Sequence, residues 1–229
     1  MSLTSQADPR TPESEVPAGD PWAPKFTPQA RVATGIVLLA IVGAAGWYFS
    51  ERPGPTAFDS AAFRLLPNEW SVHPLLFLAD SGRPRVVVPA IVFCFFVALF
   101  WSRRRAATCA LAPGIAVLIT EYVAKPTVSR VYGDSLCYPS GHMTAVAAVV
   151  CVFVLAVPPR LRVPAFVLGC LVDAGIGIVL MLLRWHYLTD VIAGIFVSVA
   201  VTLLVDTAVH LAPVSWLKNP RRTGPNVAS

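Results

Sequence analysis

Residues 137–143, CYPSGHM, stand directly before a long apolar run in a chain that is hydrophobic almost throughout. The chain has 229 residues, of which 55% are hydrophobic and only 14% are charged, and its mean hydropathy is +0.64. These values lie outside the range of soluble globular domains, so the sequence predicts an integral membrane protein. Polar groups are costly in such surroundings unless they have partners. The serine and histidine of this stretch therefore mark a candidate site.

Six apolar blocks predict an all-α bundle of six membrane helices. A block of roughly 20 apolar residues crosses a bilayer as a helix, because a helix satisfies its own backbone hydrogen bonds. The blocks lack the alternation of a β-barrel. Between the first two, residues 51–84 mix apolar and charged side chains, which indicates helices lying at the membrane surface. The blocks cover residues 32–50, 86–101, 106–124, 141–157, 163–183 and 191–211.

The segments outside the bundle are predicted to be tails. Residues 1–30 carry six prolines among polar residues, a composition that cannot bury a core, and we expect a disordered cytoplasmic tail there. The first apolar block lacks the features of a cleavable signal peptide and is expected to act as an uncleaved anchor. Residues 31–217 then form the six-helix domain, and residues 218–229 form a second disordered tail.

The basic residues favour one orientation of this bundle. Cytoplasmic loops of membrane proteins carry an excess of Lys and Arg. With six crossings, the second and fourth loops share one side with both termini. We therefore expect this side to be cytoplasmic and the opposite loops to face the periplasm or the exterior. The clusters that set this orientation are Arg103, Arg104, Arg105, Arg160, Arg162, Lys218, Arg221 and Arg222.

Composition also argues against several other classes of protein. The formal net charge is +5, but its basic residues stand singly or in short clusters beside apolar blocks, as membrane anchors do, so nucleic-acid binding is not expected. The five cysteines show no metal-ligand spacing, and most lie within apolar blocks where cysteine behaves as a small hydrophobe. No metal site, disulfide or cofactor is predicted.

Polar residues gather where four of the predicted helices end. Alternating crossings bring the end of the third block, the start of the fourth, the end of the fifth and the start of the sixth to one face of the membrane. We expect these ends to form a single outward site that suits an anion. Its members are Lys125, Arg130, Ser140, Gly141, His142, Arg184, His186 and Asp190.

Two histidines and a carboxylate in this set are residue types that enzymes use for nucleophilic catalysis. Asp190 follows His186 by four residues, so on a helical turn the carboxylate can hold one ring nitrogen protonated and leave the other free to attack. His142 arrives from another helix and can protonate a leaving oxygen as a general acid.

The remaining members of the set suit phosphate. Lys125, Arg130 and Arg184 can hold phosphate oxygens and neutralise the charge of a phosphoryl transition state. Ser140 and the Gly141 amide add donors at the positive end of a helix. A structural alternative exists for Lys125, which can pair with Glu121 one turn earlier. At the opposite side of the membrane, Asp206 and His210 are expected to pair structurally.

The motifs resemble those of the type-2 phosphatidic acid phosphatase family, which includes bacterial lipid phosphatases and soluble vanadium haloperoxidases. The segments concerned are KPTVSR at 125–130, YPSGH at 138–142 and RWHYLTDVIAG at 184–194, within a match over roughly residues 32–211. The resemblance implies a six-helix bundle of this family's type and a metal-independent phosphatase. It further implies that His186 forms a phosphohistidine, that Asp190 orients it, and that His142 donates the leaving-group proton and later helps to activate water.

The chain departs from the family's pattern at two arginines. The first motif usually has Lys, six residues and then Arg-Pro, but Tyr132 and Gly133 stand at the last two positions here. The third motif usually begins with Ser-Arg, separated from the histidine by five residues, and here Val179 and Leu180 take those places. Arg130 and Arg184 are the nearest arginines.

The expected substrate is a lipid phosphate or pyrophosphate, either polyprenyl or glycerolipid, whose chain stays in the bilayer. A transporter or flippase that holds the same head group without hydrolysis is the alternative, and Asp173 in the middle of the fifth block favours it. A vanadium haloperoxidase is a third possibility, which the six membrane helices disfavour.

Overall fold

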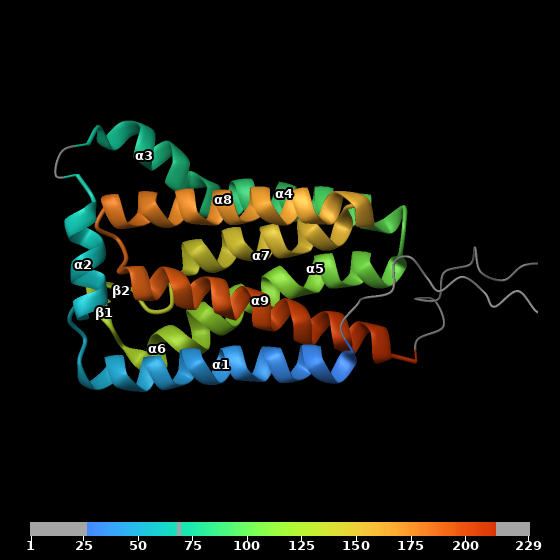
Figure 1. Cartoon of the computed structure of the whole chain (residues 1–229), viewed down its shortest axis with the longest axis horizontal. Coiled ribbons are helices and arrows are strands. Elements are labelled where there is room, and N and C mark those ends of the chain that lie inside the picture. The colour runs from blue at the N-terminus through green and yellow to red at the C-terminus, as the bar shows by residue number, and fades with distance from the viewer. Residues whose placement is uncertain (1–26, 68–69, 214–229) are drawn as a thin grey trace, which may run out of the picture.

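The computed structural model describes residues 27–67 and 70–213, and in these ranges the chain is almost entirely helical (Figure 1). The all-α prediction is therefore confirmed. The α-helices are α1 (Pro28–Glu51), α2 (Ala57–Leu65), α3 (Val72–Ala79), α4 (Pro84–Leu99), α5 (Arg103–Leu118), α6 (Lys125–Val128), α7 (Gly141–Ala156), α8 (Arg162–Leu182) and α9 (Leu188–Leu211). The shorter elements are the 3-10 turns η1 (Asp80–Gly82) and η3 (Pro159–Leu161), the π-helical turn η2 (Ile119–Ala124), and an antiparallel hairpin of β1 (Val131–Tyr132) and β2 (Ser135–Leu136).

The chain is a multi-pass membrane protein. Among the described residues, four helical segments are long and apolar enough to cross a membrane, namely Pro28–Glu51, Arg103–Val128, Pro159–Leu182 and Leu188–Leu211. The pair Val72–Gly82 and Pro84–Leu99, bent by 46°, would count as a fifth. All six predicted blocks are helical, but α7 has only 16 residues, so the predicted count of six crossings is not confirmed.

The two predicted tails lie mostly outside the residues that the structure describes. Residues 1–26 and 214–229 are not described, so the expectations for 218–229 and for most of 1–30 lie outside the described residues. The helix α1 begins at Pro28, inside the predicted N-terminal tail. Thr27 caps it, and proline at the first helical position is favourable because its missing N–H would have no partner there.

The helix α7 occupies the centre of the bundle and, with 16 residues, is as short as α4 and α5 and shorter than α8 and α9. It packs against α4, α5, α8 and α9, while α1 lies on the outer side of α9. A helix of 16 residues is roughly 24 Å long, less than the roughly 30 Å of a bilayer core. Along the long axis of the molecule, α7 begins well inside the ends of α1 and α8 (Figure 1). Its first turn is therefore recessed within the bundle.

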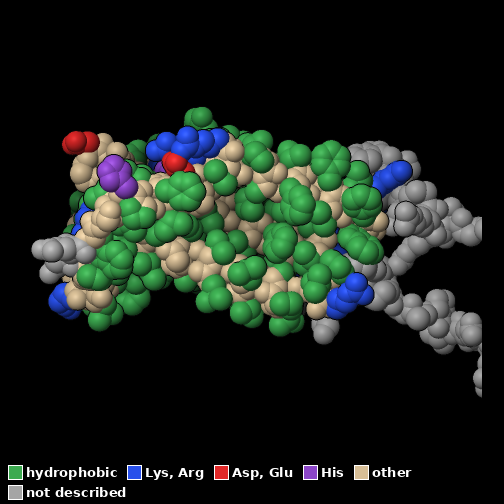
Figure 2. Space-filling model, turned by 90° about the horizontal axis from the view of Figure 1, so that it is seen from above, with side chains coloured by type: hydrophobic (Ala, Val, Ile, Leu, Met, Phe, Trp, Pro, Cys, Tyr) green, Lys and Arg blue, Asp and Glu red, His purple; other side chains and the backbone are tan. Residues whose placement is uncertain are grey.

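We call the end of the bundle at which α7 and α9 begin the site end. The helix α2 runs across it and the β-hairpin lies beside α2 (Figure 1), in keeping with the surface helix predicted within residues 51–84. On the face shown in Figure 2, hydrophobic side chains cover most of the sides of the bundle, as a lipid-facing surface requires.

The opposite end is held together by Asp206. Its carboxylate accepts a hydrogen bond from Arg31 at 2.6 Å and one from the Thr108 hydroxyl at 3.2 Å, and its Oδ1 lies 3.3 Å from His210 Nδ1. The predicted pairing of Asp206 with His210 is confirmed. Because Arg31 belongs to α1 and Asp206 to α9, this contact places the start of α1 beside the end of α9.

Small residues let α7 and α9 approach closely at the site end. A Cβ atom added at Gly194 would lie 2.8 Å from the Ser140 carbonyl oxygen and 3.1 Å from the Thr144 amide nitrogen. One turn further along, the Ser198 hydroxyl donates a hydrogen bond to the Thr144 carbonyl at 2.7 Å. The packing therefore requires glycine at position 194.

We expect Gly194→Ala to destabilise the protein by roughly 1–3 kcal/mol, since the added methyl group must displace backbone atoms. Thermal unfolding of the purified protein in detergent measures this. Gly175→Ala is the matched control, because a Cβ there meets nothing within 4 Å and alanine is the better helix former. Equal midpoints for the two variants would contradict the close packing of α7 on α9.

Candidate active site

The two motif-bearing segments are joined by a backbone hydrogen bond. The Ser140 N–H donates to the Asp190 carbonyl at 3.0 Å. The Ser140 side chain, which is fully buried, accepts a hydrogen bond from the Met143 N–H at 3.3 Å and so caps α7. In the described chain the Gly141 N–H, next in the first turn, has no hydrogen-bond partner. The starts of α7 and α9 are thereby fixed side by side, with a free amide between them.

A tight turn after α8 delivers His186. Arg184 adopts the left-handed conformation with φ 57°, its N–H donates to the Met181 carbonyl at 3.0 Å, and the Trp185 N–H donates to the Leu180 carbonyl at 3.1 Å. These two bonds form the Schellman motif that commonly ends a helix, usually with glycine at the left-handed position. The turn places His186 directly before α9.

The imidazole of His186 is held by a backbone carbonyl. Its Nδ1 lies 3.0 Å from the Cys137 carbonyl oxygen and 3.8 Å from Asp190 Oδ2. A carbonyl oxygen only accepts hydrogen bonds, so Nδ1 carries a proton, and in the neutral tautomer that this contact selects Nε2 is the nitrogen with the lone pair. The side chain is 6% exposed. The contact thus holds the His186 ring in a fixed orientation.

The predicted contact between Asp190 and His186 differs from what the structure shows. Asp190 is fully buried, and its Oδ2 accepts the Tyr187 N–H at 2.9 Å while its Oδ1 accepts Arg130 at 2.6 Å. At 3.8 Å from Nδ1, its carboxylate acts on the ring through its charge. The spacing in sequence predicted the proximity correctly, but it could not reveal that a backbone carbonyl would be the closer acceptor.

The contacts of Arg130 do not support its predicted phosphate-binding role. The side chain has 0% exposure, and the guanidinium lies between the rings of Phe49 and Tyr187, with its carbon 3.9 and 4.3 Å from the two ring centroids. All five N–H groups are used within the protein. They donate to Pro53 O, Gly54 O, Thr189 Oγ1, Asp59 Oδ2 and Asp190 Oδ1 at 2.6–3.2 Å. No donor remains for a phosphate.

Asp59 is a member of this arrangement that sequence reasoning missed. It has 0% exposure, and besides Arg130 it accepts the Thr189 N–H at 2.9 Å. It also forms a capping box with Thr56 at the start of α2. The threonine and aspartate spaced three apart are the sequence signal that could have marked it as a capping residue. No sequence pattern links it to Arg130.

His142 lies in the first turn of α7, where several charged groups act on it. Its ring centroid is 5.6 Å from that of Trp185, and Gly82 packs so closely on it that an added Cβ would lie 2.9 Å from His142 Cδ2. His186, Lys125, Arg83 and Glu121 are near enough to affect its charge state. The structure thus brings the two histidines, one in the first turn of α7 and one directly before α9, into one electrostatic neighbourhood.

Lys125 lies beside the start of α7 in a pair with Glu121. Its Nζ is 2.8 and 2.9 Å from the two carboxylate oxygens, so the structural alternative for this lysine is confirmed. A Cβ at Gly141 would overlap Glu121 Oε1 and lie 3.2 Å from Lys125 Nζ. Glu121 belongs to the π-helical turn η2, an irregularity that is frequent at functional sites. The pair is therefore next to His142. Two N–H groups of the Lys125 ammonium point to Glu121, and the third is available to a ligand.

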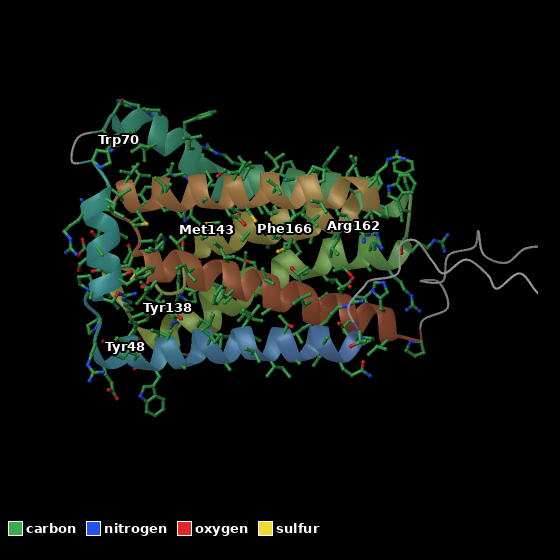
Figure 3. All side chains as sticks on the ribbon, viewed as in Figure 1. Tyr48, Trp70, Tyr138, Met143, Arg162 and Phe166 are labelled. Carbon is green, nitrogen blue, oxygen red and sulfur yellow. The ribbon has the colours of Figure 1, made fainter. Side chains whose placement is uncertain are left out.

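Arg184 is turned away from both histidines. Its guanidinium carbon lies 4.4 Å from the centroid of the Phe63 ring. It lines a pocket of about 350 Å³ together with Trp185 and Trp70, at the connection between α2 and α3 that Figure 3 marks by Trp70. These contacts do not support the predicted phosphate-binding role of Arg184.

The pKa of Asp59 gives this arrangement a testable pH dependence. Burial alone would raise that pKa, but hydrogen bonds from the Thr189 and Thr56 amides, the Thr56 hydroxyl and Arg130 hold it below its ordinary value. Because the pKa of Asp59 is lower in the folded than in the unfolded protein, the ionised carboxylate stabilises the fold at pH values above the unfolded pKa of about 4. This stabilisation is lost as the pH falls through the folded pKa.

We therefore expect the thermal midpoint in detergent to fall below about pH 4, and Asp59→Asn to lower the midpoint at neutral pH and flatten the acid dependence. Asp134→Asn is the control, because Asp134 is exposed. A steep acid loss that persists unchanged in Asp59→Asn would show that other groups cause it.

Comparison with known proteins places the site in a family. Residues 108–212 match the model described as PAP2 superfamily, and this range contains both histidines, Asp190 and Lys125. No curated protein matches the chain by sequence. The fold is similar to that of a structure described as the first transmembrane PAP2 type phosphatidylglycerolphosphate phosphatase from Bacillus subtilis, with a TM-score of 0.54 and 21% identity over 78% of this chain and 93% of the other. The segment that carries the site, residues 108–212, therefore matches the PAP2 superfamily, the type-2 phosphatidic acid phosphatases that the motifs resemble.

Proposed function

We propose that the protein is a membrane lipid phosphatase that works through a phosphohistidine on His186. The observation that carries this proposal is the hydrogen bond between His186 Nδ1 and the Cys137 carbonyl, which makes Nε2 the nucleophilic nitrogen of the neutral ring. The match of residues 108–212 to the PAP2 superfamily supports the phosphatase class. His142 from α7 supplies the second imidazole that such a reaction needs.

The reaction would proceed in two steps. The lone pair on His186 Nε2 forms a bond to phosphorus, the bond between phosphorus and the lipid oxygen breaks, and protonated His142 gives its proton to that oxygen. Water then attacks phosphorus while His142 accepts its proton. The bond from phosphorus to Nε2 breaks, and inorganic phosphate leaves with the histidine restored.

Charge distribution at His186 fits this sequence. Phosphorylation at Nε2 leaves the ring positively charged because Nδ1 keeps its proton, and the Cys137 carbonyl and the nearby Asp190 carboxylate both stabilise that charge. We assign the Gly141 N–H and the remaining donor of Lys125, whose Nζ lies beside Gly141, to the phosphate oxygens. No step uses a metal ion.

The proposed substrate is a lipid phosphate or pyrophosphate, polyprenyl or glycerolipid. The recessed start of α7 suits a head group that enters from the membrane surface while its chain stays in the bilayer. The similar structure is described as a phosphatidylglycerolphosphate phosphatase, which makes that lipid one candidate. Following the distribution of basic residues, we propose that the site end faces outward, that both termini are cytoplasmic, and that residues 31–217 form the catalytic domain.

The test is phosphate release by the purified full-length protein in detergent, with a chelator present and a panel of lipid phosphates as substrates. We expect His186→Ala to lower turnover by at least roughly 10³-fold and His142→Ala by roughly 10²–10⁴-fold. His73→Ala, a change at an exposed histidine, should leave turnover unchanged. Unfolding midpoints close to that of the wild type would exclude misfolding as the cause.

Two results would overturn the proposal. Undiminished turnover in folded His186→Ala would remove the nucleophile. Lipid translocation in reconstituted vesicles without any phosphate release would favour the transporter, for which the buried Asp173 is the supporting feature, since its Oδ1 has no hydrogen-bond partner in the described chain.

A further inference from the structure

The charged groups already placed at the site carry a net negative charge, although the proposed ligand is an anion. Two cations, Lys125 and Arg130, face three carboxylates, those of Glu121, Asp59 and Asp190, at distances of 2.6–3.1 Å. Arg130 has no free donor, and both carboxylate oxygens of Glu121 are bonded to Lys125. A phosphate at His186 would need a further cation to be held in these surroundings.

Among the described residues, Arg83 is a further cation of the site end, and the residue before it contacts His142. Gly82 is in direct contact with His142, since an added Cβ would meet its Cδ2, Cβ and Cα at 2.9–3.1 Å. The residue that follows, Arg83, also acts electrostatically on the His142 ring. Arg184, by contrast, is stacked on Phe63.

The backbone explains why Arg83 stands at this point. It precedes Pro84, and a residue before proline is disfavoured in a helix. Arg83 is accordingly extended, with φ −82° and ψ 150°, and the chain bends by 46° between η1 and α4. The bend turns Gly82 toward α7, with Arg83 beside it.

The guanidinium of Arg83 is held in place by an ion pair, but most of its hydrogen-bond donors are unused. Its Nε lies 2.8 Å from Asp80 Oδ1 in an ion pair, and its two NH₂ groups have no partner among the described residues. Half of the side chain is exposed, at 50%. This is the reverse of Arg130, whose five donors are all bonded. A planar pair of free NH₂ groups, fixed at Nε by a carboxylate, matches the geometry of two phosphate oxygens.

We infer that Arg83 is a phosphate-binding residue of this site, supplied by the segment between α3 and α4, and that it provides the positive charge that Arg130 does not. It lies outside residues 108–212, the part of the chain that matches the family. Asp80 positions it. This inference rests on the proposed phosphatase function.

Binding of orthovanadate, an analogue of phosphate, tests the inference without turnover. In the purified full-length protein, titrated by calorimetry in detergent, we expect Arg83→Ala to weaken vanadate binding at least tenfold. Arg83→Lys should recover part of the affinity, since it restores the charge without the planar fork. With a lipid substrate, Arg83→Ala should lower kcat/KM by roughly 10²-fold or more.

Arg85→Ala is the matched control. Arg85 is two residues away, carries the same charge, also pairs with Asp80, and is 63% exposed. Its removal should change vanadate affinity less than twofold. Equal losses in both variants would show a general charge effect and overturn the specific role of Arg83.

The outcomes separate this inference from the proposed function. If the wild type binds vanadate and releases phosphate while folded Arg83→Ala does both equally well, the role of Arg83 is refuted and the phosphatase stands. If the wild type neither binds vanadate nor releases phosphate from any lipid, the proposed function fails, and the assignment of Arg83 fails with it.

Discussion

The buried Arg130 guanidinium is the interaction on which the site end depends. Removing a cation from water costs several kcal/mol unless its hydrogen bonds and its charge are satisfied. Here two carboxylates, two carbonyls, one hydroxyl and the faces of two aromatic rings satisfy it. Its acceptors belong to residues 53–59 before and within α2 and to the first turn of α9. One side chain thus holds α2 across the bundle and fixes the start of α9, where His186 is delivered.

The same residue also positions the carbonyl that orients the nucleophile. The Cys137 N–H donates to the Arg130 carbonyl at 2.9 Å, which closes the hairpin loop and leaves the Cys137 carbonyl facing His186. The next residue, Tyr138, lies between α9 and α1 (Figure 3), and its hydroxyl donates to the Val42 carbonyl at 2.7 Å. Because Asp190 is bonded to Arg130 and to the Tyr187 amide, a neutral carbonyl rather than a carboxylate holds the imidazole proton.

Much of this site could be predicted from the sequence, because crossing helices bring their ends together by topology alone. The convergence of the segments around residues 125, 142 and 186, and the pairs Lys125–Glu121 and Asp206–His210, follow from helix direction and from spacing by four residues. The partners of Arg130 could not be predicted, since Asp59 is 71 residues away and reads locally as a helix cap. The turn at Arg184 was equally hidden, because the sequence lacks the glycine that usually marks a left-handed helix end. The predicted number of crossings is not confirmed, and apolar composition alone does not reveal that α7 has only 16 residues.

That short helix and the buried arginine have a common consequence for phosphate chemistry. The first turn of α7 lies inside the bundle, where the effective dielectric constant is lower than at the surface and unbalanced charges repel more strongly. A carboxylate facing the phosphate there would oppose binding. Arg130 balances one of the two negative charges of Asp59 and Asp190 behind His186, and an imidazole adds no negative charge of its own. The arrangement therefore separates two tasks, since Arg130 holds the rear of the site and offsets part of its negative charge. Any cation that binds the phosphate must then come from another element.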